Sequence, residues 1–310
     1  TVNSYARGGA AGRGVFAGRH SPTFLSTIDY IQIPTLGNAV SFGDLTDEVQ
    51  ARSGGYSDGN RGVFCGGSKP SLTDDCDYIT IPSAGNGIDF GNLTSARDFV
   101  SSCSSSTRGI TAGGRSGSPT TAQNIIEYAE LQTIGNHIDF GDLSVATHIA
   151  GAGSSPTRAV FAGGGNASDV TISTIQTVNF AAKGNAVKFG DLTVTNRPGS
   201  GGCSNSVRAL FAGGYVPGGI RFNNIDVLNL ASGGNAVDSG NLDRLIYSPM
   251  GLASQTRAVF GGGQDTSGKI NNIQYVNIST LGNAADFGDL TEPGRAGGTA
   301  SDSHGGLGGF

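Results

Sequence analysis

A unit of about 49 residues occurs six times along this chain of 310 residues, and the repeat constrains the fold more than any other feature. Each copy opens on an Arg followed by an apolar stretch. It closes on a Gly-Asn pair followed by Gly-Asp-Leu or a near variant. The copies begin near Arg13, Arg61, Arg108, Arg158, Arg208 and Arg257. A period of this length is typical of propellers, solenoids and other repeat arrays.

Within each copy the residue pattern predicts four short β-strands. The first is a stretch of small residues such as 151–155, which suits the crowded place where strands converge on an axis. The second is apolar and ends at a Gly pair, as in 158–164, and the third alternates, as in 27–33. Turn residues bracket a fourth, outer strand. The sequence therefore predicts an all-β fold, a six-bladed β-propeller of four-stranded antiparallel blades, in one domain over residues 1–310.

The two ends of the chain predict how the ring closes. Residues 291–310 follow the sixth copy, and His304-Gly305-Gly306-Leu307 resembles the opening stretch 61–64 of a further copy. We therefore expect the N- and C-terminal segments to share one blade, which leaves no open sheet edge. An open array with a partial seventh copy is the alternative.

Composition narrows the classes of partner. The formal net charge is −5 and the isoelectric point is near 5.3, whereas a nucleic-acid partner requires a basic face. No apolar run approaches the roughly 20 residues that span a bilayer. We expect a soluble protein with no nucleic-acid partner and no membrane insertion.

The repeats resemble kelch repeats. In copy two the Gly pair is Gly66-Gly67, the following Tyr is Tyr78, and Phe90 stands where kelch units have a Trp. Two copies depart further, with Thr177 and Val227 in place of the Tyr. The Gly-Asn-Ala and Phe-Gly-Asp-Leu-Thr motifs are similar to repeat proteins of tailed phages, particularly those of marine and cyanobacterial hosts. This resemblance implies a virion structural or fibre protein, located in the virion or extracellular. Its partners are then other virion or assembly subunits, or a cell-surface glycan or protein.

The six repeated Arg residues could form a ring that binds an anion. A residue needed by every blade more simply has a structural role, in which the guanidinium donates hydrogen bonds that tie neighbouring segments together. Its expected acceptor is the residue after Phe-Gly, or after Ser-Gly in the fifth copy. These residues are Asp44, Asn92, Asp142, Asp191, Asn241 and Asp289. Because two of the six are Asn, the shared property is a side-chain carbonyl oxygen and not a charge. This pattern argues against six metal sites.

The sequence predicts no catalytic site, no metal and no cofactor. The four histidines, His20, His137, His148 and His304, occupy different phases of the repeat, and none has metal-ligand spacing. The run Asp74-Asp75-Cys76-Asp77 offers ligands for Ca²⁺, although a solvated loop explains it more simply.

The cysteines are expected to have structural positions. Cys103 and Cys203 share one phase of the repeat and are expected to be small core residues. Cys65 and Cys76 flank one loop and could face each other across two strands, which leaves a disulfide open.

Function is expected in the variable loops that follow the Gly pairs. These loops differ in every copy and should emerge on one face, where recognition is commonly located. Their candidate binding residues are Phe24, Lys69, Arg115, Tyr215 and Arg221. The leading hypothesis is a non-enzymatic virion structural, fibre or decoration protein that recognises a partner through this face. The alternatives are a secreted carbohydrate-binding propeller, which the lack of Trp disfavours, and an enzyme, for which no catalytic constellation is present.

Overall fold

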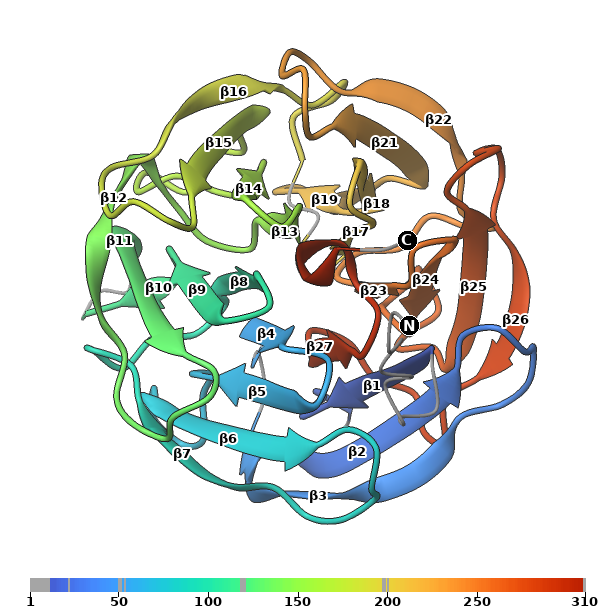
Figure 1. Ribbon diagram of the computed structural model, residues 1–310. Coiled ribbons are helices and arrows are strands. Elements are labelled where there is room, and N and C mark those ends of the chain that lie inside the picture. The colour runs from blue at the N-terminus through green and yellow to red at the C-terminus, as the bar shows by residue number, and fades with distance from the viewer. Residues whose placement is uncertain are drawn as a thin grey trace, which may run out of the picture.

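The computed structural model describes residues 12–21, 23–49, 52, 54–117, 121–196, 199 and 201–308. Six antiparallel sheets stand around a central axis, each with four strands ordered from the axis to the rim (Figure 1). The predicted six-bladed β-propeller is therefore confirmed. No helix among the described residues is long and apolar enough to cross a membrane.

The blades are numbered in chain order and their strands are given from the axis outward. Blade 1 consists of β27 (Gly298–Ser301), β1 (Arg13–Ala17), β2 (Leu25–Gln32) and β3 (Val40–Val49). Blade 2 consists of β4 (Gly54–Ser57), β5 (Arg61–Cys65), β6 (Asp75–Thr80) and β7 (Ile88–Asn92). Blade 3 consists of β8 (Ser101–Ser104), β9 (Arg108–Ala112), β11 (Thr121–Glu130) and β12 (Ile138–Thr147), with β10 (Arg115–Ser116) pairing at the start of β11.

The second half of the ring repeats this arrangement. Blade 4 consists of β13 (Gly151–Ser154), β14 (Arg158–Ala162), β15 (Thr174–Asn179) and β16 (Val187–Asp191). Blade 5 consists of β17 (Gly202–Ser204), β18 (Arg208–Ala212), β21 (Asn224–Asn229) and β22 (Val237–Asn241), and its variable loop adds the hairpin of β19 (Tyr215–Val216) and β20 (Ile220–Arg221). Blade 6 consists of β23 (Met250–Ala253), β24 (Arg257–Gly261), β25 (Asn272–Asn277) and β26 (Ala285–Asp289).

The innermost strands are built from small residues because six of them crowd around the axis. A Cβ atom on Gly55 would lie 2.3 Å from the carbonyl oxygen of Thr299 in the neighbouring blade, too close for any side chain. The apolar second strands pack further out, where hydrophobic clusters join adjacent blades. Val160 of blade 4 and Phe211 of blade 5, for example, belong to one such cluster. Burial of these side chains between sheets supplies the main driving force for the ring.

The ring closes through β1 and β27, as the ends of the sequence predict. The two strands are antiparallel and pair Gly14 with Ser301 and Ala17 with Gly298. The expected place of 304–307 as the start of a further apolar strand is wrong, because β1 already occupies that position in blade 1. The chain instead turns after β27 into the 3₁₀ helix η1 (Gly305–Leu307).

The repeated Arg joins neighbouring blades, but the acceptor expected from the sequence is wrong. Each guanidinium donates from NH1 to a backbone carbonyl just beyond the third strand of the adjacent blade, at 2.6 to 2.8 Å. In chain order the six acceptors are the carbonyl oxygens of Ile81, Leu131, Phe180, Leu230, Ile278 and Ile33. Five of the guanidiniums also lie over an aromatic ring. A backbone acceptor places no demand on sequence, which is why no partner residue could be read from the repeat.

The closing motifs form a second set of bonds between blades. The backbone N–H of the residue after Phe-Gly donates to the side-chain oxygen of the Asn of the Gly-Asn pair in the next blade. These pairs are Asp44 with Asn86, Asn92 with Asn136, Asp142 with Asn185, Asp191 with Asn235, Asn241 with Asn283, and Asp289 with Asn38. The preceding glycine is required by close approach, since a Cβ on Gly141 would lie 2.5 Å from the carbonyl oxygen of Gly184. Asp and Asn are interchangeable as the donor residue because the hydrogen bond is donated by the backbone N–H and not by the side chain.

A third set of bonds is buried and was not predicted. The third strand of every blade carries a buried polar residue that accepts hydrogen bonds from the residue after Leu in the preceding blade. These acceptors are Asp29, Asp77, Glu127, Gln176, Asp226 and Gln274. Three of the carboxylates also pair with a fully buried guanidinium: Asp29 with Arg19, Asp77 with Arg52, and Glu127 with Arg97. Arg19 is thus a core residue and not part of a recognition loop.

Candidate functional site

Two kinds of irregular connection emerge on one face of the ring: the variable loops and the segments that lead from one blade to the next. Because strands alternate in direction, the loop between the second and third strands and the segment that leads to the next blade lie at the same end of each sheet. We call this end the variable-loop face. The short turns, the Gly-Asn loops and η1 lie on the opposite face, which we call the plug face (Figure 1).

On the variable-loop face, a second tyrosine ring and two arginine guanidiniums gather around Tyr247. The rings of Tyr215 and Tyr247 have centroids 4.8 Å apart and are tilted by 57°. The guanidinium of Arg295 lies 4.7 Å from the Tyr247 ring centroid and that of Arg221 lies 5.7 Å from it. Tyr215 and Arg221 are held together because they pair across the β19–β20 hairpin. These four residues, from blades 5, 6 and 1, are the Tyr247 cluster.

Positive charge gathers at this cluster without matching carboxylates. Among the described residues neither Arg221 nor Arg295 forms an ion pair, and the buried Nε atom of each has no hydrogen-bond partner there. Burial raises the pKa of Tyr247, and the two guanidiniums oppose that rise. Burial together with Arg295 lowers the pKa of Lys269. Burial, Lys269 and Arg295 hold the pKa of His20 at about 4, so this imidazole is neutral at pH 7. An anion placed here would meet two guanidiniums that no carboxylate of the described chain pairs with.

The structure brings together only two of the five predicted binding residues. Lys69 is held by Asp47 and Asp75, at 2.5 and 2.7 Å. Arg115 forms a two-point contact with Asp98. Phe24 lies beside the His20 ring, with centroids 6.0 Å apart. These three side chains have local partners. Tyr215 and Arg221 are the two predicted binding residues that the structure places in the Tyr247 cluster.

The acidic run of blade 2 does not converge on a cation. Asp77 is buried against Arg52, and Cys76 lies in the core. Asp75 turns to Lys69 and Thr73. Alternation along the strand places Cys76 on the face opposite Asp75 and Asp77. The two carboxylates share a face but pair with different cationic side chains, Lys69 and Arg52.

Tyr247 and Arg295 were missed because they lie outside the loops that follow the Gly pairs. Both belong to the segment before an innermost strand, and residues of this segment form bridges to the first residue of the variable loop in the same blade. The bridges are Asp98 with Arg115, His148 with Gly165, Tyr247 with Gln264, and Arg295 with His20. The four positions carry four different residue types, and that variability was the available sequence signal.

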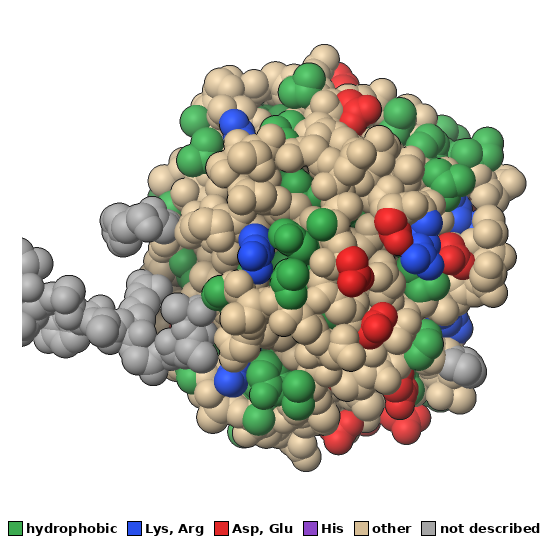
Figure 2. Space-filling model, turned by 90° about the vertical axis from the view of Figure 1, so that its right-hand side faces the viewer, with side chains coloured by type: hydrophobic (Ala, Val, Ile, Leu, Met, Phe, Trp, Pro, Cys, Tyr) green, Lys and Arg blue, Asp and Glu red, His purple; other side chains and the backbone are tan. Residues whose placement is uncertain are grey.

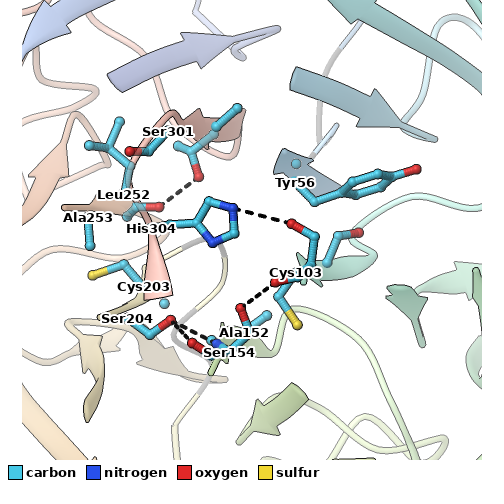
Figure 3. Close-up of a pocket in the computed structure, with 18 of the residues that line it drawn as sticks. Tyr56, Cys103, Ala152, Ser154, Cys203, Ser204, Leu252, Ala253, Ser301 and His304 are labelled. Carbon is cyan, nitrogen blue, oxygen red and sulfur yellow. Dashed lines mark hydrogen bonds between the residues drawn. The ribbon is translucent and has the colours of Figure 1, made fainter. Parts of the chain in front are cut away.

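The central channel is narrow and lined by the innermost strands of all six blades, with a free volume of about 60 Å³ (Figure 3). A chain of serine hydroxyls runs around it. Ser57, Ser104, Ser154 and Ser204 each donate from Oγ to the carbonyl oxygen of the serine in the preceding blade, at 2.5 to 2.9 Å. These bonds satisfy the polar atoms of a crowded interior and leave little room for a ligand.

His304 closes the channel from the plug face. Its Nε2 atom lies 2.8 Å from the carbonyl oxygen of Ser57, and its Nδ1 atom accepts the backbone N–H of Gly306 at 3.1 Å. These partners fix a neutral imidazole with the proton on Nε2, because Nδ1 is used as an acceptor. Burial lowers the pKa of His304 to about 4, against a hydrogen bond to Ser57 that raises it. Figure 3 shows the ring among the innermost strands.

We expect acid to destabilise the ring through His304. The unfolded chain binds a proton on this residue below about pH 6.5, whereas the folded chain does so only below about pH 4. Stability is therefore lost as the pH falls through that window, by about 2 kcal/mol between pH 7 and pH 4.5. Denaturant unfolding at both pH values should show this loss in the native protein. In His304→Gln, whose side chain cannot titrate, the loss of unfolding free energy between the two pH values should be smaller by about 2 kcal/mol. An equal loss in both proteins would contradict the role given to His304.

Comparison with known proteins agrees with the architecture. No protein-family model matches the chain, and no curated protein matches it. Among solved structures, that of YjhT superposes with a TM-score of 0.67 over 85% of this chain and 91% of that chain, at 10% sequence identity. The chain is a β-propeller. At this identity the likeness concerns the fold alone.

Proposed function

We propose that this propeller is a non-enzymatic recognition module that binds carboxylate-bearing glycans through the Tyr247 cluster. One observation carries the proposal: two guanidiniums lie against a single Tyr ring and, among the described residues, have no carboxylate partner. Arg presents a planar fork of donors that matches a carboxylate. The tilted rings of Tyr215 and Tyr247 add half-buried aromatic surface, which suits the apolar face of a sugar ring.

The proposed site is asymmetric, as expected when recognition depends on loops that differ in each blade. Tyr and Arg dominate the binding energy of interfaces, and the cluster holds two of each within one contact network. On the side drawn in Figure 2, where β25 and β26 lie, Lys and Arg are interspersed with Asp and Glu.

The biological setting of the proposal is a virus particle. The kelch-like repeats and their similarity to tailed-phage repeat proteins support a fibre, decoration or adhesion domain that contacts other virion subunits and a cell surface. A rigid ring with one variable face fits such a role, since loops on a fixed scaffold can diverge without loss of the fold. A secreted lectin-like propeller is the alternative setting for the same site.

The proposal is tested with polygalacturonate, which carries a carboxylate on each sugar, and with its neutral methyl ester. The native protein should be retained by immobilised polygalacturonate, less so at high salt, and not by the ester. Tyr215→Ala combined with Arg221→Ala should weaken retention by at least about tenfold. The matched control is Arg244→Ala, whose guanidinium is already paired with Asp243. Equal binding to both polymers, or an equal effect of both variants, contradicts the proposal.

A further inference from the structure

Blade 2 departs from the repeat at two facing positions. Cys65 stands where the other copies have a small residue, namely Ala17, Ala112, Ala162, Ala212 and Gly261. Cys76 is its partner across β5 and β6 and replaces an isoleucine that every other copy has, at Ile28, Ile126, Ile175, Ile225 and Ile273. The two cysteines face each other, as the sequence allowed, but both are free thiols.

Two further departures reach the same place, one from a loop of blade 3 and one from the innermost strand of blade 2. His137 follows the Gly-Asn pair that blade 3 contributes, where the other copies have Ala39, Gly87, Ala186, Ala236 and Ala284. Tyr56 lies on β4, where the other copies have Cys103, Gly153, Cys203, Leu252 and Ala300. Four side chains that break the repeat independently therefore converge at one interface between blades. A requirement of packing alone would not select two thiols, an imidazole and a phenol for one apolar pocket.

The convergence is close enough for shared coordination. The Sγ atom of Cys65 lies 3.8 Å from His137 Nε2, and the Sγ atom of Cys76 lies 3.8 Å from His137 Nδ1. One ion binds only one nitrogen of the imidazole, so one of the two thiols must shift toward that nitrogen when the three residues share an ion. One ligand atom from each of the three residues falls within 4.8 Å of the others. The Tyr56 hydroxyl is 2.8 Å from His137 Nε2 and 3.9 Å from Cys65 Sγ. In a tetrahedral zinc site, bonds of about 2.3 Å to sulfur and 2.0 Å to nitrogen place the ligand atoms about 3.5 to 4 Å apart.

Burial and charge also suit a divalent cation. Both cysteines are fully buried, and His137 and Tyr56 are each 3% exposed. Two thiolates balance the charge of one Zn²⁺, so the loaded site is neutral if the imidazole is neutral. The nearby guanidiniums of Arg52 and Arg97 do not upset this balance, because Asp77 and Glu127 already pair with them.

We propose that Cys65, Cys76 and His137, with the Tyr56 hydroxyl beside them, form a structural zinc site between blades 2 and 3. Binding releases the two thiol protons to solvent and forms two zinc–sulfur bonds and one zinc–nitrogen bond, and a water molecule that the ion retains fills the fourth position of the tetrahedron. The cation would join β5 and β6 of one blade to the Gly-Asn loop of the next, in addition to the bonds that all blades share. The site differs from the Tyr247 cluster in position and in ligand chemistry.

The other five copies supply matched variants for the test. Cys65→Ala, Cys76→Ile and His137→Ala each install the residue type found at that position elsewhere in the ring, so the variants are expected to fold. Cys203→Ala is the control, since Cys203 is buried on another blade. Reduced protein should be loaded with Zn²⁺ or with Co²⁺, dialysed and measured for metal content and for thiolate-to-cobalt absorption.

The native protein and Cys203→Ala should each retain one metal ion per chain and show the thiolate-to-cobalt band. Each of the three matched variants should lose retention by at least tenfold. A chelator should lower the melting temperature of the native protein and leave that of Cys76→Ile unchanged. Absence of retained Zn²⁺ in reduced native protein, or retention that survives all three variants, would overturn the zinc assignment. A Cys65–Cys76 disulfide that persists in freshly prepared native protein would overturn it as well.

Discussion

Deletion of residues 291–310 is expected to open the ring and to lower the melting temperature by at least about 10 °C, or to cause aggregation. The deletion removes β27, so β1 loses its inner partner and presents an unpaired strand edge at the axis. It also removes Thr291, whose backbone and side chain bond to the buried Asp29 of blade 1. Differential scanning calorimetry and light scattering measure both outcomes.

A shorter deletion separates the contribution of β27 from that of the 3₁₀ helix η1 that follows it. Removal of residues 305–310 takes away η1 and leaves β27 in place. We expect this variant to stay monomeric and to melt closer to the native protein than the longer deletion does. If the longer deletion is monomeric with an unchanged melting temperature, the pairing of β1 with β27 does not hold the ring together.

The second large effect is expected from the buried ion pair of blade 3. Arg97 and Glu127 are both fully buried, and Arg97 also donates to the carbonyl oxygen of Gly113 at 2.8 Å. Arg97→Ile leaves the carboxylate without its cation and should reduce the free energy of unfolding by about 3 to 5 kcal/mol. Chemical denaturation followed by circular dichroism measures the loss.

Blade 6 indicates how that loss can be reversed. The carbonyl oxygen of Arg97 accepts from Gly67, and that of Ile246 accepts from the equivalent Gly214, so the two residues occupy the same position. The carboxylate position opposite Ile246 is Gln274, which is neutral. The double variant Arg97→Ile with Glu127→Gln reproduces that natural combination and should recover most of the stability. If the double variant is no more stable than the single one, the cost does not arise from the unpaired charge.

The fold could be predicted because the repeat fixes strand number, order and closure at once. Small residues such as 151–154 mark the axis, and the Gly pairs mark the ends of the second strands. The bonds between blades were harder to predict, because the repeated Arg and the Gly-Asn motif both meet backbone atoms. The Arg meets a backbone carbonyl and the Asn a backbone N–H, groups that almost every residue has, so the sequence contains no matching partner to find.

The candidate sites could be predicted only in part, because their residues come from different copies of the repeat. Tyr215 and Arg221 lie in one variable loop and were identifiable, whereas Tyr247 and Arg295 come from different blades. Cys65 and His137 are separated by more than one repeat, and only the ring brings them together. Departures from the repeat are the signal that would have marked the cysteines and His137. A comparison of copies by position finds such residues before their contacts are known.

The orientation of β1 and β27 gives the ring two unlike sides. β1 runs from Arg13 toward the variable-loop face, and the antiparallel β27 returns to Ser301 on the plug face. Both ends of the described blade therefore lie on the side opposite the Tyr247 cluster. A tether that continues directly from either end of this blade would hold the ring at the plug face and leave the variable-loop face exposed. Capture on a solid support through such a tether would leave the cluster facing solution.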